Sequence, residues 1–220
     1  MAPLVHHYLM SYNVTIIDYG MGNLCSVHNA LQYLGARVRV CSDPANVAAS
    51  ETLVLPGVGS FRAGMLELKR RGLDYAIQEA VIGKRSTILG ICLGMQIMGT
   101  RSTEDGDTQG LGLILSGVDR FSAPEIGHRK VPHIGFNAVT HEDSSRLFAG
   151  LPSASDFYFV HSFRMLPIEV PALVASCEYG VKFMAAYEHD NIYATQFHPE
   201  KSQINGLWLL RNFLQQQYSC

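Results

Sequence analysis

Cys92 lies in the sequence Gly90-Ile91-Cys92-Leu93-Gly94, which has the spacing of a sharp turn that presents a nucleophile. A β-type stretch at 86–89 precedes it and a helix-type stretch at 95–98 follows it. Such a turn strains the backbone of the nucleophile and exposes its side chain at a helix N-terminus, where the dipole favours a thiolate and free N–H groups can hold an oxyanion. The pattern predicts a catalytic thiol; its alternative is a buried cysteine in a glycine-rich turn.

A candidate base lies near the C-terminus. Residues 193–197 have the character of a strand, which leads into His198-Pro199-Glu200. A histidine at a strand end can take the thiol proton, while a carboxylate two residues further on orients the ring and stabilises its charge. Taken singly, His198 is typical of a structural histidine and Glu200 of a surface carboxylate that caps the last helix. Together with the cysteine turn they predict a Cys92-His198-Glu200 triad.

Two motifs resemble those of the triad-type (class I) glutamine amidotransferases: Gly-Ile-Cys-Leu-Gly-Met-Gln at 90–96 and Gln-Phe-His-Pro-Glu-Lys-Ser at 196–202. Further segments are similar to the glutaminase subunits of imidazole glycerol phosphate synthase, an enzyme of histidine biosynthesis. These segments are 17–24, 55–61, 110–114, 130–137 and 158–163. The resemblance extends from residue 13 to residue 217.

The resemblance implies a substrate, L-glutamine, and a reaction. Cys92 attacks the amide carbon and forms a thioester, and His198 passes the thiol proton to the departing ammonia. The expected oxyanion donors are the backbone N–H groups of Leu93 and Val58, the latter in a Pro-Gly-Val-Gly loop whose peptide orientation is linked to activation in this family. The residues expected to bind glutamine are Gly57, Gly59, Gln96, Ser162 and Phe163.

Taken alone, two of these features have plainer interpretations. The Pro-Gly-Val-Gly sequence at 56–59 is simply a turn, and Gln96 is an ordinary helix-surface glutamine. His161 has no carboxylate partner nearby in the sequence, so we interpret it as structural. No metal and no cofactor is expected.

Ammonia is protonated in neutral water, so glutaminases of this kind pass it internally to a synthase. The resemblance implies a heterodimer with a separate (β/α)8 cyclase subunit, which makes imidazole glycerol phosphate and aminoimidazole carboxamide ribotide. Segments 19–23 and 132–137 match family segments near that interface. Phe136 stands where the family usually has tryptophan, and Phe163 where it often has tyrosine, which leaves the identity of the partner open.

Three alternatives therefore remain. A paralogue of this subunit supplies ammonia for amidino-sugar (surface polysaccharide) biosynthesis. A cysteine peptidase of similar fold is disfavoured by Glu200 so close to His198, together with Gln96. A non-catalytic regulatory relative would have no need of an intact triad.

Composition excludes several other classes of function. The 220 residues carry a net charge of −2, so there is no electrostatic case for nucleic acid or an anionic membrane. No apolar run is long enough to cross a bilayer. The five cysteines lie far apart without a Cys-x-x-Cys pair, which argues against zinc and against a disulfide framework. A free catalytic thiol suits a reducing cytoplasm, which is the expected location.

The element pattern predicts an α/β fold: a flavodoxin-like, doubly wound, mostly parallel sheet with an antiparallel extension. The first half alternates strands at 14–17, 37–41, 52–55 and 86–91 with helices at 23–34, 62–70 and 73–82. The second half has short β segments at 111–121, 133–140, 157–163, 172–178, 182–189 and 192–197, then a helix at 203–216. Residues 1–12 are expected to be a disordered extension and 13–220 a single amidotransferase domain.

Overall fold

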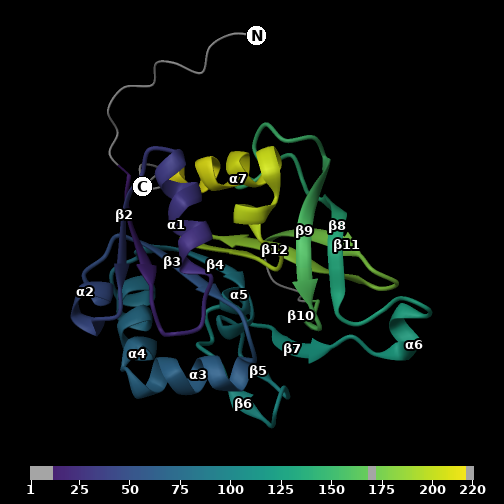
Figure 1. The fold of residues 1–220 in the computed structure, drawn as a ribbon, viewed down its shortest axis with the longest axis horizontal. Coiled ribbons are helices and arrows are strands. Elements are labelled where there is room, and N and C mark those ends of the chain that lie inside the picture. Colours follow the sequence, from purple (N-terminus) through teal and green to yellow (C-terminus); the bar gives the residue numbers. More distant parts are fainter. Residues whose placement is uncertain (1–11, 168–171, 217–220) are drawn as a thin grey trace.

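A nine-stranded sheet forms the centre of the molecule in the computed structural model, which describes residues 12–167 and 172–216 (Figure 1). Its spatial order is β2 (Arg37–Cys41), β1 (Asn13–Ile17), β3 (Thr52–Gly57), β4 (Thr87–Cys92), β13 (Ile192–Thr195), β12 (Lys182–His189), β11 (Leu173–Glu178), β8 (His133–Thr140) and β9 (Ala154–His161). The first five strands are parallel and each later neighbour is antiparallel, which confirms the predicted fold class. The segment expected to be a disordered extension lies outside the described residues except for Tyr12.

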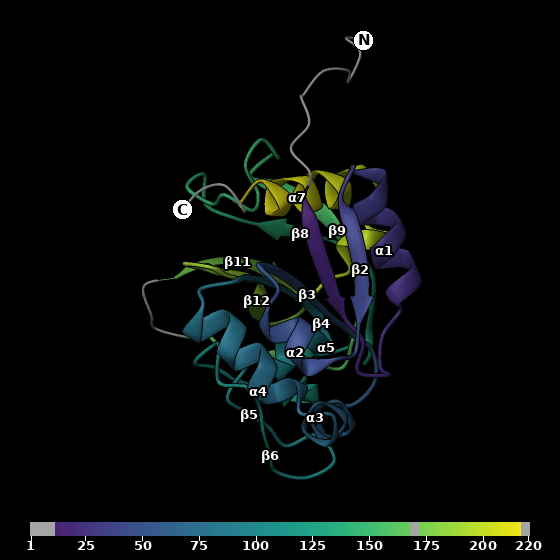
Figure 2. The ribbon, with the colours of Figure 1, turned by 90° about the vertical axis from the view of Figure 1, so that its left-hand side faces the viewer.

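Helices cover both faces of this sheet (Figure 2). One face carries α1 (Leu24–Tyr33) and α7 (Gln203–Gln215), and the other carries α2 (Pro44–Ala48), α3 (Phe61–Arg70), α4 (Leu73–Gln78) and α5 (Leu93–Ile97). Because side chains of a strand alternate, Ile16 and Ile17 enter opposite cores. The helix predicted at 73–82 continues from α4 into a π-helical turn at Glu79–Gly83, and the sequence analysis missed α2.

A second, four-stranded sheet was not predicted. Its order is β10 (Phe163–Met165), β7 (Gly117–Arg120), β5 (Arg101–Ser102) and β6 (Thr108–Gln109), and a short helix, α6 (Ala123–Ile126), follows β7. The strand predicted at 111–121 is wrong in its first half. There the N–H groups of Leu111 and Ile114 donate to the carbonyls of Ile97 and Met98, so this segment caps the end of α5.

The strand predicted at 157–163 is divided at Ser162. Strand β9 ends at His161 in the large sheet, and β10 begins at Phe163 in the small one. The chain therefore changes sheets at one residue, next to the ends of β3 and β4. This crossing brings the small sheet against the carboxyl ends of the parallel strands, where such folds hold their sites.

Candidate active site

The turn at the end of β4 has the strained geometry that its glycines predict. Cys92 has φ +54° and ψ −108°, outside the usual regions for a residue with a side chain. A Cβ at Gly94 would lie 1.7 Å from the carbonyl oxygen of Leu55, and one at Gly90 would lie 2.5 Å from the sulfur of Met98. Gly94 is therefore required for α5 to pack directly on β3, and Gly90 for it to pack on β4, and Cys92 is left at the N-terminus of that helix.

His198 and Glu200 meet behind the thiol. Nδ1 of His198 lies 2.8 Å from Oε1 of Glu200, and the two side chains are 2% and 1% exposed. The backbone N–H of His198 donates to the carbonyl of Tyr158, and the hydroxyl of Ser202 donates to the carbonyl of His198. The carboxylate thus holds Nδ1 of the ring and the backbone of His198 is held separately, while Nε2 has no hydrogen-bond partner within the structure.

The electrostatics of this group favour a protonated imidazole. Burial lowers the pKa of His198, but the adjacent Cys92 thiol and the Glu200 carboxylate outweigh burial and raise the pKa to about 10. A ring with this pKa holds a proton firmly at neutral pH. This arrangement can therefore hold a proton on the imidazole, next to the sulfur of Cys92.

Two amide side chains organise the space around the thiol. The Gln96 amide donates to the carbonyl of Phe163 at 2.8 Å and to Oε1 of Gln196 at 3.0 Å, while the Gln196 amide lies 3.8 Å from the sulfur of Cys92. Both amide protons of Gln96 are thus used within the protein, and its Oε1 is the atom left for a ligand. Gln196, which the sequence analysis did not single out, precedes His198 by two residues.

The two predicted oxyanion donors differ in their state. Leu93 lies at the first position of α5, beside Cys92, and lines the cavity. Val58 also lines the cavity, but its backbone N–H donates to the carbonyl of Met21 at 3.2 Å. In this structure the Val58 N–H is therefore directed to the loop that follows β1 and not to the thiol. Gly57 pairs with Cys92 across β3 and β4 and does not line the cavity.

A cavity of about 280 Å³ opens at the thiol. Its lining includes most of the residues that the sequence analysis singled out: Val58, Gly59, Cys92, Leu93, Gln96, Ser162, Phe163 and His198. It also includes Glu104, which the sequence analysis missed. Oε2 of Glu104 accepts a hydrogen bond from the N–H of Phe61 at 2.7 Å, and burial raises the pKa of its carboxyl. Glu104 belongs to the short loop between β5 and β6, where no periodic pattern marks a site.

His161 lines the cavity as well, but its ring is fully engaged. Its Nδ1 lies 2.9 Å from the carbonyl of Phe163, which requires a donor, so its Nε2 accepts from Nδ1 of His133 at 3.0 Å. Nε2 of His133 in turn accepts from the amide of Asn137 at 3.1 Å. Burial lowers the pKa of His161 to about 3 and that of His133 to about 4. This histidine pair is neutral, so His161 is not a second base.

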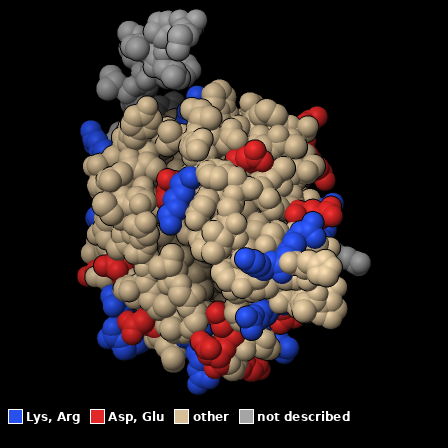
Figure 3. Space-filling model, turned by 45° about the vertical axis from the view of Figure 1, so that its right-hand side comes forward, with Lys and Arg blue, Asp and Glu red and all other residues tan. Residues whose placement is uncertain are grey.

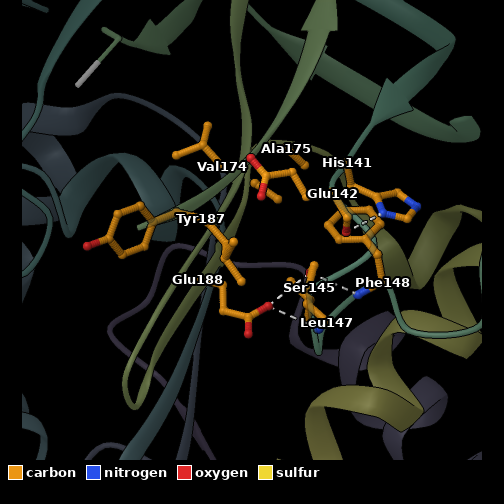
Figure 4. Close-up of a pocket in the computed structure, with 11 residues that line it drawn as sticks. His141, Glu142, Ser145, Leu147, Phe148, Val174, Ala175, Tyr187 and Glu188 are labelled. Carbon is orange, nitrogen blue, oxygen red and sulfur yellow. Dashed lines mark hydrogen bonds between the residues drawn. The ribbon is translucent and has the colours of Figure 1, made fainter. Parts of the chain in front are cut away.

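A separate small pocket lies against β11 and β12 (Figure 4). Its volume is about 10 Å³, and the Glu188 carboxylate beside it accepts from the hydroxyl of Ser145 and the N–H of Leu147. The carboxylate also pairs with Arg146 at 2.7 Å. Every one of these contacts ties a surface loop to the sheet, which makes the group structural.

On the face drawn in Figure 3, basic and acidic side chains are interspersed.

Comparison with known proteins agrees with this geometry. The family model "Glutamine amidotransferase class-I" matches residues 15–216. The chain belongs to the class-I glutamine amidotransferase family. A protein of Syntrophotalea carbinolica named "Imidazole glycerol phosphate synthase subunit HisH" is 46% identical over 203 residues, which cover 91% of this chain and 98% of that protein. One of the same name from Acinetobacter baylyi is 41% identical over 203 residues, which cover 92% of this chain and 97% of that protein.

Solved structures share the fold at lower identity. The structure described as "Crystal structure of glutamine amidotransferase" aligns with a TM-score of 0.72 at 17% identity and covers 92% of this chain and 98% of that one. PurLQS from Thermotoga maritima aligns with a TM-score of 0.69 at 16% identity and covers 94% and 99%. Within residues 12–167 and 172–216, no helix is long and apolar enough to cross a membrane.

Proposed function

We propose that this chain is the glutaminase subunit of an imidazole glycerol phosphate synthase, which hydrolyses L-glutamine to glutamate and ammonia for histidine biosynthesis. The observation that carries the proposal is the buried contact of His198 and Glu200 beside a thiol on a strained turn. The curated relatives align with this chain over nearly their whole length and carry the name of that synthase. Their name gives no support to amidino-sugar biosynthesis.

Cys92 is the proposed nucleophile. Its sulfur forms a bond to the amide carbon of glutamine, and the thiol proton held by His198 goes to the leaving nitrogen, so ammonia departs and a thioester remains. His198 then takes a proton from water, whose oxygen attacks the thioester. The carbon–sulfur bond breaks, glutamate leaves and the proton returns to Cys92. Glu200 keeps the ring in one orientation and stabilises its charge throughout.

Glu104 is the proposed partner of the α-ammonium group of glutamine. It is the only carboxylate that lines the cavity among the described residues. Gly59 and the backbone at Ser162 and Phe163 are proposed to bind the remaining polar groups of the amino-acid end. Gln96 supports this side of the site because its amide fixes the carbonyl of Phe163, and its free Oε1 can accept a hydrogen bond from the substrate.

The oxyanion hole is proposed to consist of the N–H groups of Leu93 and Val58. Because the Val58 N–H donates to the carbonyl of Met21, this peptide must turn before the hole is complete. We propose that a (β/α)8 cyclase subunit favours the turned peptide, so that glutamine is hydrolysed when ammonia can be used. Released ammonia passes to that subunit inside a heterodimer, which we place in the cytoplasm.

The test uses the complex of this chain with the cyclase subunit of the same organism. Cys92→Ala should abolish synthesis of imidazole glycerol phosphate from glutamine and leave synthesis from added ammonium salt intact. The wild-type complex serves as control for both nitrogen sources. Glutamine-dependent synthesis by the Cys92→Ala complex at the wild-type rate would refute the assignment, as would failure of the two chains to associate in light scattering.

A further inference from the structure

The hydroxyl of Tyr19 is a buried polar group that the proposed chemistry leaves without a role. Tyr19 follows β1, its side chain is 1% exposed, and its Oη has no hydrogen-bond partner in the structure. Among the described residues it is the only buried hydroxyl in that state. An unpartnered buried hydroxyl is costly, because it loses its bonds to water and gains none in return. A second conformation of the protein, in which this hydroxyl has a hydrogen-bond partner, would explain its presence in the core.

The position of this hydroxyl identifies that partner. A Cβ added to Gly57 would lie 2.1 Å from Tyr19 Oη and 2.9 Å from Cβ of Leu93. Oη therefore touches the backbone of Gly57, which carries the carbonyl half of the Gly57–Val58 peptide. The ring continues toward α3, where Cε2 would lie 3.6 Å from a Cβ on Gly64. The phenol thus lies between the Pro-Gly-Val-Gly loop at 56–59 and the two helices α3 and α5.

The segment that contains Tyr19 also contacts the other half of the Gly57–Val58 peptide, its N–H group. Met21, two residues after Tyr19, accepts the Val58 N–H through its carbonyl. The segment is itself fixed, because the N–H of Asp18 donates to the carbonyl of Cys41 and the N–H of Gly20 donates to the Asp18 carboxylate. One anchored loop therefore contacts the backbone of Gly57 and accepts the N–H of Val58, the two residues that share this peptide.

We infer that Tyr19 is a positioning residue for the oxyanion hole, whose hydroxyl donates to the Gly57 carbonyl when the Val58 N–H turns toward Cys92. The two groups belong to one planar peptide, so rotation of the N–H away from Met21 must also move the carbonyl oxygen. In the resting arrangement Met21 satisfies the N–H and Tyr19 is unpaired. In the turned arrangement Tyr19 satisfies the carbonyl. The inference rests on the proposed function, since it concerns the same peptide.

Tyr19→Phe removes this hydroxyl and keeps the ring in the core. We expect the ratio of cyclase-stimulated to basal glutaminase kcat to fall about 10-fold, because the turned peptide then leaves a carbonyl unpaired. The KM for glutamine should stay within a factor of about two, since Tyr19 does not line the cavity. The Tm of the free subunit should be unchanged or higher, because the unpaired hydroxyl is removed from the resting state.

The matched control is Tyr187→Phe, which deletes a hydroxyl from another buried tyrosine on β12, outside the cavity. It should leave both glutaminase rates as they are. Stimulation of Tyr19→Phe equal to that of the wild type would overturn the inference and leave the proposed function standing. A lower Tm with equal losses of basal and stimulated rates would overturn it too, in favour of a purely structural role. If the cyclase failed to stimulate even the wild type, the proposed function and this inference would both be wrong.

Discussion

Replacement of Glu104 by glutamine should weaken glutamine binding without slowing the chemical step. The substitution removes the charge that is proposed to face the α-ammonium group. Glutamine keeps an oxygen that can accept the N–H of Phe61, which Glu104 now accepts at 2.7 Å, so the start of α3 remains capped. The change therefore separates substrate recognition from local stability.

The magnitude follows from the environment of the carboxylate. A hydrogen bond between charged groups contributes about 1.5–3 kcal/mol. Because Glu104 is only half-buried, solvent screens its charge, and the lower end of this range applies. The expected result is a rise of about 10-fold in the KM for glutamine, with kcat within a factor of about two.

The assay measures ammonia release by the complex with two substrates, glutamine and glutaramate, which is glutamine without its α-amino group. Glu104→Gln should lower kcat/KM for glutamine and leave that for glutaramate unchanged, since the missing charge has nothing to bind in the second substrate. Asp105→Asn, which neutralises the exposed neighbouring carboxylate, is the control. Equal losses with both substrates would refute the proposed contact with the α-ammonium group.

Two further predictions concern the triad and the histidines. Glu200→Gln removes a charge that raises the pKa of His198, so stimulated kcat should fall by about 10²–10⁴-fold with a normal circular dichroism spectrum; a loss below threefold would contradict its role. The free energy of unfolding, from urea titrations, should be highest between about pH 6 and 7. Below that range His161 and His133 are protonated in the unfolded chain but not in the native one, where their pKa values are about 3 and 4, so stability falls as the pH falls. Above that range His198 loses its proton in the unfolded chain but keeps it in the native one up to about pH 10, so stability falls as the pH rises. A stability that rose steadily from pH 6 to pH 9 would contradict the assignment of charge to His198.

The fold and the meeting of His198 with Glu200 beside Cys92 could be predicted because their sequence signals are local. Glycines on both sides of Cys92 specify a turn that no larger residue permits, and His198 and Glu200 are two residues apart. The alternation of strands and helices in the first half likewise depends on short-range periodicity. The small second sheet had no such signal, since β5 and β6 have two residues each and are held by pairing, β5 with β7 and β6 with β5.

What could not be predicted depends on contacts between distant segments. Glu104 enters the cavity because a loop of the small sheet reaches the start of α3, 43 residues earlier in the chain. The direction of the Val58 N–H depends on where Met21 lies, and a sequence motif does not specify a peptide's rotation. Gln96 was expected to use its amide on the substrate, but Phe163 and Gln196, which lie far along the chain, occupy both protons.

The hydrogen bonds through the histidine pair all run in one direction, and through them a residue of β8, the strand next to the edge of the large sheet, affects the cavity. In each hydrogen bond from the Asn137 amide through His133 and His161 to the carbonyl of Phe163, the donor lies on the Asn137 side. A carboxylate at position 137 would offer an acceptor where the nearer ring also has one. That ring would have to gain a charge, or both rings would have to reverse and turn a lone pair toward Phe163. The residue type at half-exposed position 137 is thereby linked to the Phe163 carbonyl that binds Gln96. This link depends on the direction of the hydrogen bonds and requires no movement of the backbone.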